Sequence, residues 1–162
     1  MNNLAFAQDG CGVVQKSLSL LVEANPAFVI FSTDQASAFQ RAPRAQMLRG
    51  LYEDPSLRHM VPYYLSLYGL EGPATLYFGD FYRWLSEEGC QQGCSLGVLL
   101  YILAVSPVIE KLMEEFPNVS VLGFVDDYYF CGLPEETARC YERYGQLLSE
   151  QGMALNHAKG FV

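Results

Sequence analysis

The stretch VSVLGFVDDYYF, residues 119–130, places two adjacent carboxylates, Asp126 and Asp127, in a run that is largely apolar or aromatic. Burying one ionised carboxylate without a partner is costly, and burying two costs more. Runs rich in branched and aromatic residues are typical of strands. We therefore expect strands over 119–125 and 128–131, joined at Asp126-Asp127, and a fold that offsets these two charges.

The Asp126-Asp127 pair has a purely structural explanation as well as a functional one. Aspartate is a common turn residue, so a surface hairpin is the simpler interpretation. A two-residue hairpin turn usually has glycine at its second position, because both central residues have positive φ. Neither residue is glycine, so we expect some backbone strain at the pair, and such strain often collects at functional sites.

Asp34 supplies a third carboxylate in a similar setting. It follows the apolar run AFVIFS, residues 27–32, which predicts a buried strand. If that strand lies beside the hairpin, the carboxylates converge, and two like charges about 4 Å apart repel by roughly 1 kcal/mol in water and about 4 kcal/mol near a protein surface. A divalent cation converts this repulsion into coordination, and Mg²⁺ prefers oxygen ligands. Neighbouring strand residues point to opposite faces, so we expect Asp126 to be the direct ligand with Asp34, and Asp127 to be secondary.

The remaining sequence predicts a mixture of helices and strands in one domain of 162 residues. Pro107 is expected to kink or break the helix predicted over 95–116. The predicted elements are helices over 13–24, 36–51, 56–68, 95–116 and 134–151, a hairpin over 75–85 with a type II′ turn at Gly79-Asp80, and an extended segment over 153–162. This order indicates an α+β fold, a small antiparallel sheet with helices packed on one face.

Composition narrows the function classes. The chain has 10 basic and 18 acidic residues, a formal net charge of −8, which argues against a uniformly basic nucleic-acid-binding surface. Four arginines fall close together after Asp34 and form either a local positive patch or, more commonly, a solvated helix face: Arg41, Arg44, Arg49 and Arg58. Hydrophobic residues make up 51%, enough for a packed core.

Cysteines and apolar runs bear on location. The five cysteines are odd in number and include no Cys-x-x-Cys pair, which argues against structural zinc and favours reduced thiols in an intracellular protein. Residues 1–12 lack the pattern of a signal peptide. The longest apolar run, residues 96–109, is about 14 residues, too short to span a bilayer, so we expect no membrane association.

Four short motifs follow one another along the chain. They are STDQASAFQRAPRAQML (residues 32–48), SEEGCQQGCSLGVLLYILAVSPVIEKL (86–112), LGFVDDYYF (122–130) and, more weakly, GMALNHAKGFV (152–162). Together they resemble the palm domain of reverse transcriptases, in particular those of retrotransposons without long terminal repeats. The resemblance extends over roughly residues 10–162 and implies a ferredoxin-like core, with a lead-in helix from the fingers side over 1–26 and palm motifs over 27–162.

The resemblance implies specific roles for individual residues. Asp34, Asp126 and Asp127 would hold two Mg²⁺ ions, with Mn²⁺ as an alternative. The residues implied to meet substrate are Phe39 beneath the sugar of the incoming nucleotide, Gln92 and Gly93 along the template, and Phe124 near the primer end. Lys159 matches a lysine that protonates the leaving pyrophosphate. The sequence departs from the family pattern at Ser95, Gly97 and Gly160, where proline, serine and threonine are usual.

The implied activity is RNA-directed DNA polymerisation, the attack of a primer 3′-hydroxyl on the α-phosphate of a deoxynucleoside triphosphate. The implied partners are an RNA or DNA template with its primer, dNTPs, and the fingers and thumb segments of a larger polyprotein. Lys16 is the only basic residue before Asp34, so we expect fingers and thumb to be largely missing and the chain to be a fragment.

Two alternatives stay open at this point. A catalytically inert palm-like module that binds another protein fits the expected lack of fingers and thumb and the charge of −8. Another palm-type nucleotidyltransferase, such as a nucleotide cyclase, shares the carboxylates, but the Gln92-Gly93 motif and its following helix argue against it.

Overall fold

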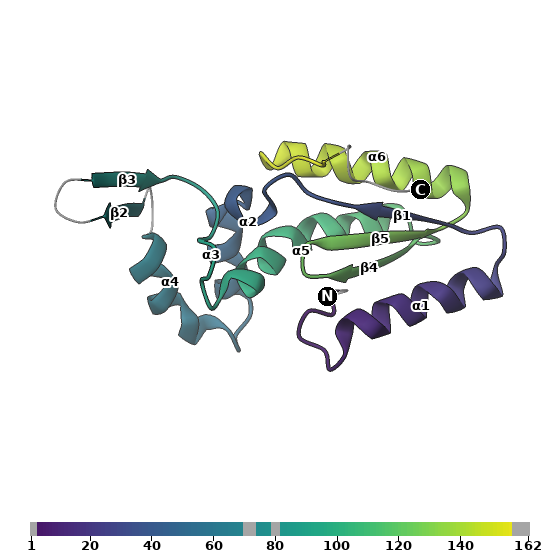
Figure 1. The fold of residues 1–162 in the computed structure, drawn as a ribbon, viewed down its shortest axis with the longest axis horizontal. Helices are drawn as coiled ribbons and strands as arrows, with labels where there is room; N and C mark the ends of the chain where they lie inside the picture. The colour runs from purple at the N-terminus through teal and green to yellow at the C-terminus, as the bar shows by residue number, and fades with distance from the viewer. Residues whose placement is uncertain (1–2, 70–73, 79–81, 157–162) are drawn as a thin grey trace. The chain divides into compact units, whose positions relative to one another are not determined.

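The computed structural model describes residues 3–69, 74–78 and 82–156 (Figure 1). The chain forms two compact units. Residues 1–38 and 105–162 form the first, called the sheet unit below, and residues 39–104 form the second, called the helical unit. No helix in the part of the chain that the structure describes is long and apolar enough to cross a membrane.

The sheet unit is built on a three-stranded antiparallel sheet in the order β1-β5-β4 (Figure 1). The strands are β1 (Val29–Thr33), β4 (Ser120–Phe124) and β5 (Asp127–Gly132). All three come from the apolar runs that predicted strands, and the predicted class of a small antiparallel sheet with packed helices is confirmed.

The turn between β4 and β5 lies one residue earlier than the sequence predicts. Phe124 pairs with Asp127, so the two-residue turn is Val125-Asp126 and Asp127 opens β5. Val125 has a φ of 58°, whereas the φ of Asp126 is not positive. This sign pattern is that of a type II′ turn, which needs only one residue with positive φ. The expected strain therefore lies on Val125 and not on the carboxylates.

Helix α6 (Pro134–Glu150) packs on one face of the sheet. The ring of Phe130 lies 5.2 Å from that of Tyr144, and the ring of Phe31 lies 5.6 Å from that of Tyr141. Pro134 occupies the first turn of α6, where proline is common, and Gly152 follows the helix with a φ of 79°, as is typical after a helix end.

Helix α1 (Gly10–Ala24) covers the opposite face (Figure 1). Its buried Val14 and Leu18 form an apolar cluster with Cys131, and Tyr129 packs against that cluster. Alternate strand residues point to opposite faces, and here both sets are apolar. The sheet therefore carries helices on both faces. The sequence predicted helices on one face alone.

The helical unit contains short helices, a hairpin and the first half of α5. Its elements are α2 (Ala38–Arg41), α3 (Arg44–Glu53), the 3₁₀ helix η1 (Arg58–Met60), α4 (Val61–Tyr68), β2 (Ala74–Phe78), β3 (Tyr82–Ser86) and α5 (Gly97–Glu115), whose second half belongs to the sheet unit. Strands β2 and β3 pair antiparallel, which confirms the predicted hairpin. Its turn at Gly79-Asp80 lies outside the described residues.

Two helix predictions need correction. The helix expected over 36–51 is interrupted at Ala42-Pro43, where Pro43 has an extended ψ of 119° and precedes α3. Proline cannot donate a backbone hydrogen bond, and it disfavours helical geometry at the residue before it. Helix α5, by contrast, continues through Pro107, so the break that was one of the two outcomes expected there does not occur. The buried neighbours Val105 and Val108 anchor it there, and that packing offsets the lost hydrogen bond.

Candidate active site

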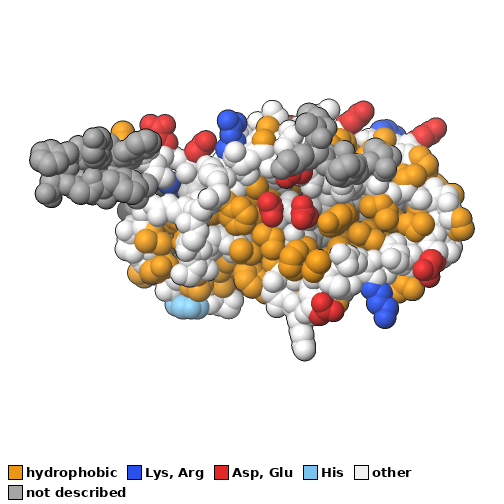
Figure 2. All heavy atoms as spheres, viewed as in Figure 1, with side chains coloured by type: hydrophobic (Ala, Val, Ile, Leu, Met, Phe, Trp, Pro, Cys, Tyr) orange, Lys and Arg blue, Asp and Glu red, His pale blue; other side chains and the backbone are white. Residues whose placement is uncertain are grey.

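The strand register brings the predicted carboxylates to one end of the sheet. The last pair between β1 and β5 is Thr33 with Tyr128. One residue further on, Asp34 follows β1 and Asp127 begins β5, so these two residues lie side by side, and Asp126 stands in the adjoining turn. Figure 2 shows acidic side chains close together among hydrophobic ones on the face in view.

Asp127 feels the charges of the other two carboxylates. Burial, the charge of Asp126 and, to a smaller extent, the charge of Asp34 raise the pKa of Asp127. A raised pKa means that the ionised form of Asp127 is held at a cost in free energy. Part of this cost, after the larger contribution of burial, is the repulsion expected from carboxylates at one strand end, and a bound cation would relieve that part.

The adjacent aspartates have different surroundings. Burial and, to a smaller extent, the charge of Asp126 raise the pKa of Tyr128 to about 12. Burial and the charge of Asp127 raise the pKa of Tyr129. Tyr128 and Tyr129 point to opposite faces of β5, so the two carboxylates are not interchangeable. Which of them binds a metal directly stays a prediction.

Asp34 is held by the segment that follows α6. The side-chain amide of Asn156 donates to Asp34 Oδ2 at 3.2 Å, and its backbone N–H donates to the Asp34 carbonyl at 2.8 Å. Leu155 pairs with Gln35 in an antiparallel bridge. The sequence motif contained Asn156 without assigning it a role. Lys159, from the same motif, lies outside the described residues.

Buried polar side chains fix the backbone on either side of Asp34. The hydroxyl of Thr33 donates to the Tyr128 carbonyl at 3.1 Å and accepts from the Tyr128 N–H at 3.3 Å. Gln35 donates through Nε2 to the Tyr144 hydroxyl at 2.6 Å. Thr33 and Gln35 are both buried. The strand end that carries Asp34 is therefore tied to β5 and to α6, which preorganises the position of the carboxylate.

The predicted substrate residues occupy varied environments. Phe39 is half-buried, and its ring lies 5.1 Å from that of Tyr101 within the helical unit. Gln92 and Gly93 form an exposed turn before α5, with a φ of 86° at Gly93. Phe124 is half-buried and packs against the apolar cluster beneath α1. Contacts of these residues with a nucleotide, template or primer stay predictions.

Arg44 holds the loop that leads to Gln92-Gly93. Its guanidinium donates to the Ser86 carbonyl at 2.6 Å, the Ser86 hydroxyl at 2.6 Å, the Gly89 carbonyl at 2.8 Å and the Glu88 carbonyl at 3.1 Å. It also lies 4.9 Å from the centre of the Tyr68 ring, within range of a cation–π interaction. Burial lowers the pKa of Arg44. This arginine is therefore part of the loop's structure.

The other arginines near it do not form a shared patch. Arg49 pairs with Glu53 at 2.7 Å on the exposed side of α3. Arg58 donates to the Tyr52 carbonyl at 2.7 Å. Arg44, Arg49 and Arg58 are each engaged by their own local acceptors, so these three residues do not form the positive patch that the sequence left open as the less common outcome.

Replacing Arg44 by lysine should destabilise the helical unit by about 1–3 kcal/mol. Lysine keeps the charge, but it cannot donate in a fork to several carbonyls, and the acceptors left unpaired carry a desolvation cost. Chemical denaturation of the full chain measures the change. Arg49→Lys is the matched control, since its exposed pair contributes less than about 1 kcal/mol. Equal effects of the two substitutions would contradict the role of Arg44.

The donor set at the strand end suits an oxygen-preferring divalent ion such as Mg²⁺. Within residues 3–69, 74–78 and 82–156, however, no three carboxylate, imidazole or thiol side chains are gathered closely enough to form a ready metal site. All five cysteines are free thiols. The carboxylates of Asp34, Asp126 and Asp127 are close enough to interact but would have to draw together around an ion.

Removing the Asp127 charge should stabilise the protein in the absence of metal. A carboxyl whose pKa is raised in the fold binds its proton more tightly there, so stability falls as pH rises above its ordinary value of 3.8. Asp127→Asn should therefore raise the melting temperature at pH 7. The gain in the free energy of unfolding should be less than about 1 kcal/mol, because the side chain is exposed. The gain should vanish near pH 3. A lower melting temperature at pH 7 would contradict this electrostatic account.

Comparisons with known proteins agree with the fold and the motifs. The family model for reverse transcriptase (RNA-dependent DNA polymerase) matches residues 7–161. No curated protein matches the sequence.

Solved telomerase structures resemble the chain. Telomerase from Candida albicans, in complex with a TWJ fragment of telomeric RNA, gives a TM-score of 0.71 at 12% identity over 99% of this chain and 30% of that one. Apo telomerase from Candida tropicalis, truncated from its C-terminal domain, gives a TM-score of 0.65 at 16% identity over 96% of this chain and 35% of that one. At these identities the likeness shows the fold alone, and the chain spans about a third of the length of those telomerase chains. Because the family match extends over nearly the whole sequence, this protein belongs to the reverse transcriptase (RNA-dependent DNA polymerase) family.

Proposed function

We propose that this chain is the palm of an RNA-directed DNA polymerase of the kind found in retrotransposons without long terminal repeats. It would extend a primer on an RNA or DNA template by adding deoxynucleotides to the 3′-hydroxyl. The observation that carries the proposal is the meeting of Asp34, Asp126 and Asp127 at one strand end, where the pKa of Asp127 responds to both neighbours.

Two divalent ions would be held by these carboxylates, Mg²⁺ by preference, with Mn²⁺ as an alternative. Such ions stabilise the attacking and leaving oxygens of a phosphoryl transfer. Asp34 and Asp126 would be the principal ligands and Asp127 the secondary one. Asn156 would keep the Asp34 carboxylate oriented through its 3.2 Å hydrogen bond. Most of the catalytic effect would then come from positioning and electrostatics.

Substrate selection would rest on residues of the helical unit. Phe39, supported by the Tyr101 ring, would lie beneath the sugar of the incoming dNTP and exclude a 2′-hydroxyl. Gln92 and Gly93 would run along the template, on a loop that Arg44 holds in place. Phe124 would pack near the primer end, and Lys159 would protonate the pyrophosphate.

Primer extension tests the proposal. The chain, alone and within the longest protein that contains it, is incubated with an RNA template, a DNA primer, dNTPs and Mg²⁺ or Mn²⁺. Template-dependent extension that is lost in Asp34→Asn supports it. An absence of incorporation in every form of the protein would refute it, and cyclic or untemplated nucleotide products would indicate another palm-type nucleotidyltransferase.

An inert palm-like module is the second candidate. It is favoured by the formal net charge of −8 and by the finding that, among the described residues, no three carboxylate, imidazole or thiol side chains are gathered closely enough to form a ready metal site. Such a module would fold normally, and neither Mg²⁺ nor Mn²⁺ would raise its melting temperature at millimolar concentration. A clear increase in melting temperature, lost in Asp126→Asn, would show that the carboxylates bind the ion, and template-dependent primer extension would rule this candidate out.

A further inference from the structure

Val125 holds an unfavourable backbone conformation directly before the paired aspartates. Its φ of 58° lies in the left-handed region, which an L-residue enters at a cost of about 1–2 kcal/mol. For a β-branched residue such a φ is a genuine outlier. Strain of this kind persists only where surrounding contacts hold it.

The side chain of Asn3 supplies those contacts. Its Nδ2 donates to the Val125 carbonyl at 2.7 Å, and its Oδ1 accepts from the Val125 N–H at 3.1 Å. One amide thus engages both backbone polar groups of the strained residue. These two residues stand 122 positions apart in the sequence.

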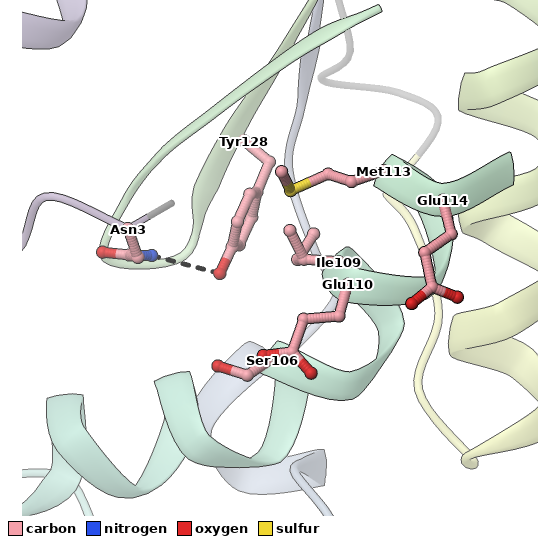
Figure 3. A pocket seen from close by; sticks show the side chains of 7 residues that line it. All are labelled: Asn3, Ser106, Ile109, Glu110, Met113, Glu114 and Tyr128. Atoms are coloured by element: carbon pink, nitrogen blue, oxygen red, sulfur yellow. Dashed lines mark hydrogen bonds between the residues drawn. The ribbon is translucent and has the colours of Figure 1, made fainter. Parts of the chain in front are cut away.

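The Asn3 side-chain amide makes two further hydrogen bonds. Nδ2 donates to the Tyr128 hydroxyl at 3.1 Å, and Oδ1 accepts from the Ala5 N–H at 3.1 Å. Figure 3 shows Asn3 facing Tyr128 across this bond, beside Ile109 of α5. An asparagine side chain offers two donor hydrogens and two acceptor lone pairs. All four are satisfied here, which fixes the orientation of the amide.

The backbone around this contact is shaped to admit the amide. Asn3 forms a parallel bridge with Gly123, and the Leu4 N–H donates to the Gly123 carbonyl at 2.8 Å. A Cβ at Gly123 would come within 2.6 Å of the Tyr128 ring and 3.0 Å of Asn3 Nδ2. Glycine at this position is what leaves space for the Asn3 contact with both sides of the hairpin.

We propose that Asn3 is a positioning residue of the active site, which clamps Val125 in the left-handed conformation and thereby orients Asp126. The residues it grips, Val125 and Tyr128, flank the aspartates on both sides. A rotation of the Val125 backbone would swing the next residue, Asp126, away from Asp34. This proposal rests on the proposed function, because it concerns the orientation of the proposed metal ligand.

Two readouts on the full chain test the clamp. The first is the affinity for Mn²⁺, measured by electron paramagnetic resonance of the free ion. The second is the short distance between the amide and α protons of Val125 that a positive φ produces, measured by nuclear magnetic resonance. Asn3→Ala should weaken Mn²⁺ binding by about 10- to 100-fold, as the loss of residues that support metal ligands does. It should also weaken the nuclear Overhauser signal between the amide and α protons of Val125, called the Val125 signal below.

A second substitution separates positioning from a general structural role. Glycine adopts positive φ without a steric penalty, so Val125→Gly in the Asn3→Ala chain should restore most of the Mn²⁺ affinity. Asn25→Ala is the matched control, since Asn25 is exposed at the end of α1 and, among the described residues, its side chain donates one hydrogen bond, to the Leu21 carbonyl at 3.4 Å. It should leave Mn²⁺ binding unchanged.

The outcomes distinguish this proposal from the proposed function. Unchanged Mn²⁺ affinity in Asn3→Ala, or a double variant that binds as weakly as Asn3→Ala, would overturn the clamp. If the unmodified chain binds no Mn²⁺, the proposed metal site fails, and the Val125 signal alone decides. Its loss in Asn3→Ala then supports the clamp, and its persistence overturns it.

Discussion

Asp126→Asn is expected to reduce the rate of nucleotide addition about a thousandfold while leaving the fold intact. The substitution removes a full charge from the proposed metal site, and single electrostatic groups of this kind contribute about 10²–10³ in rate. The fold should be as stable as before or more stable, because Asp126 lies in a two-residue turn and its charge is one of those that raise the pKa of Asp127. Single-nucleotide incorporation and thermal unfolding measure the two effects.

Asp9→Asn is the matched control for this substitution. Asp9 is exposed before α1 and has a φ of 52°, a conformation that asparagine tolerates. The same chemical change at this exposed position, whose side chain makes no capping hydrogen bond, should leave the rate unchanged and alter stability by less than about 1 kcal/mol. An Asp126→Asn protein that collapses on mild heating would return the aspartate pair to a structural role, and one with full activity would remove Asp126 from the site.

Gly89→Ala should be the most destabilising single substitution considered, at about 3–5 kcal/mol. Gly89 has a φ of 68°, and a Cβ there would overlap the backbone carbonyl of Gln40. The added methyl group combines the left-handed penalty of about 1–2 kcal/mol with a backbone displacement of about 1–3 kcal/mol. It would also disturb the hydrogen bonds of Gly89 to Arg44 and to Ala42. Chemical denaturation measures the loss.

Gly93→Ala measures the backbone part of that effect alone, so the difference between the two variants isolates the steric part. Gly93 also has a positive φ, 86°, but a Cβ added to it would meet nothing within 4 Å. Its cost should be limited to the backbone penalty of about 1–2 kcal/mol. If Gly89→Ala and Gly93→Ala destabilise equally, the close approach of Gln40 does not matter, and the account of the loop is wrong.

Much of the sheet could be predicted because its signals are local. The runs at 27–32 and 119–130 are apolar and rich in branched and aromatic residues, and they became β1, β4 and β5. Helix α6 begins at Pro134 and is followed by Gly152, both of which are readable from sequence. Asp34 at one strand end and Asp126 beside another led to the prediction that the carboxylates converge if the strands are neighbours, and the strand register places Asp34 beside Asp127.

The predictions that were wrong concern positions where local sequence preferences compete with tertiary contacts. The turn at Val125-Asp126 could not be predicted from propensity, because valine disfavours positive φ. Its conformation is supported by Asn3, which is distant in the sequence. Pro43, which interrupts the expected helix over 36–51, was a local signal that the apolar periodicity concealed.

The supporting residues of the site were the least predictable. Asn3 and Asn156 each contact a residue 122 positions away, and a single asparagine carries no signal of such a partner. Arg44 was one of four arginines in sequence, and only its contacts with Ser86 and Gly89 single it out. Side chains that position others are therefore found from structure, while those that carry the charge are found from sequence.

We have proposed that Asp34, Asp126 and Asp127 form one divalent-metal site. Anomalous diffraction from crystals of the chain soaked in Mn²⁺ would locate the ion itself. We expect an anomalous peak bounded by these three carboxylates, and its loss in crystals of Asp126→Asn. Mn²⁺ located only beside other acidic side chains, with the strand end empty at saturating Mn²⁺, would contradict it.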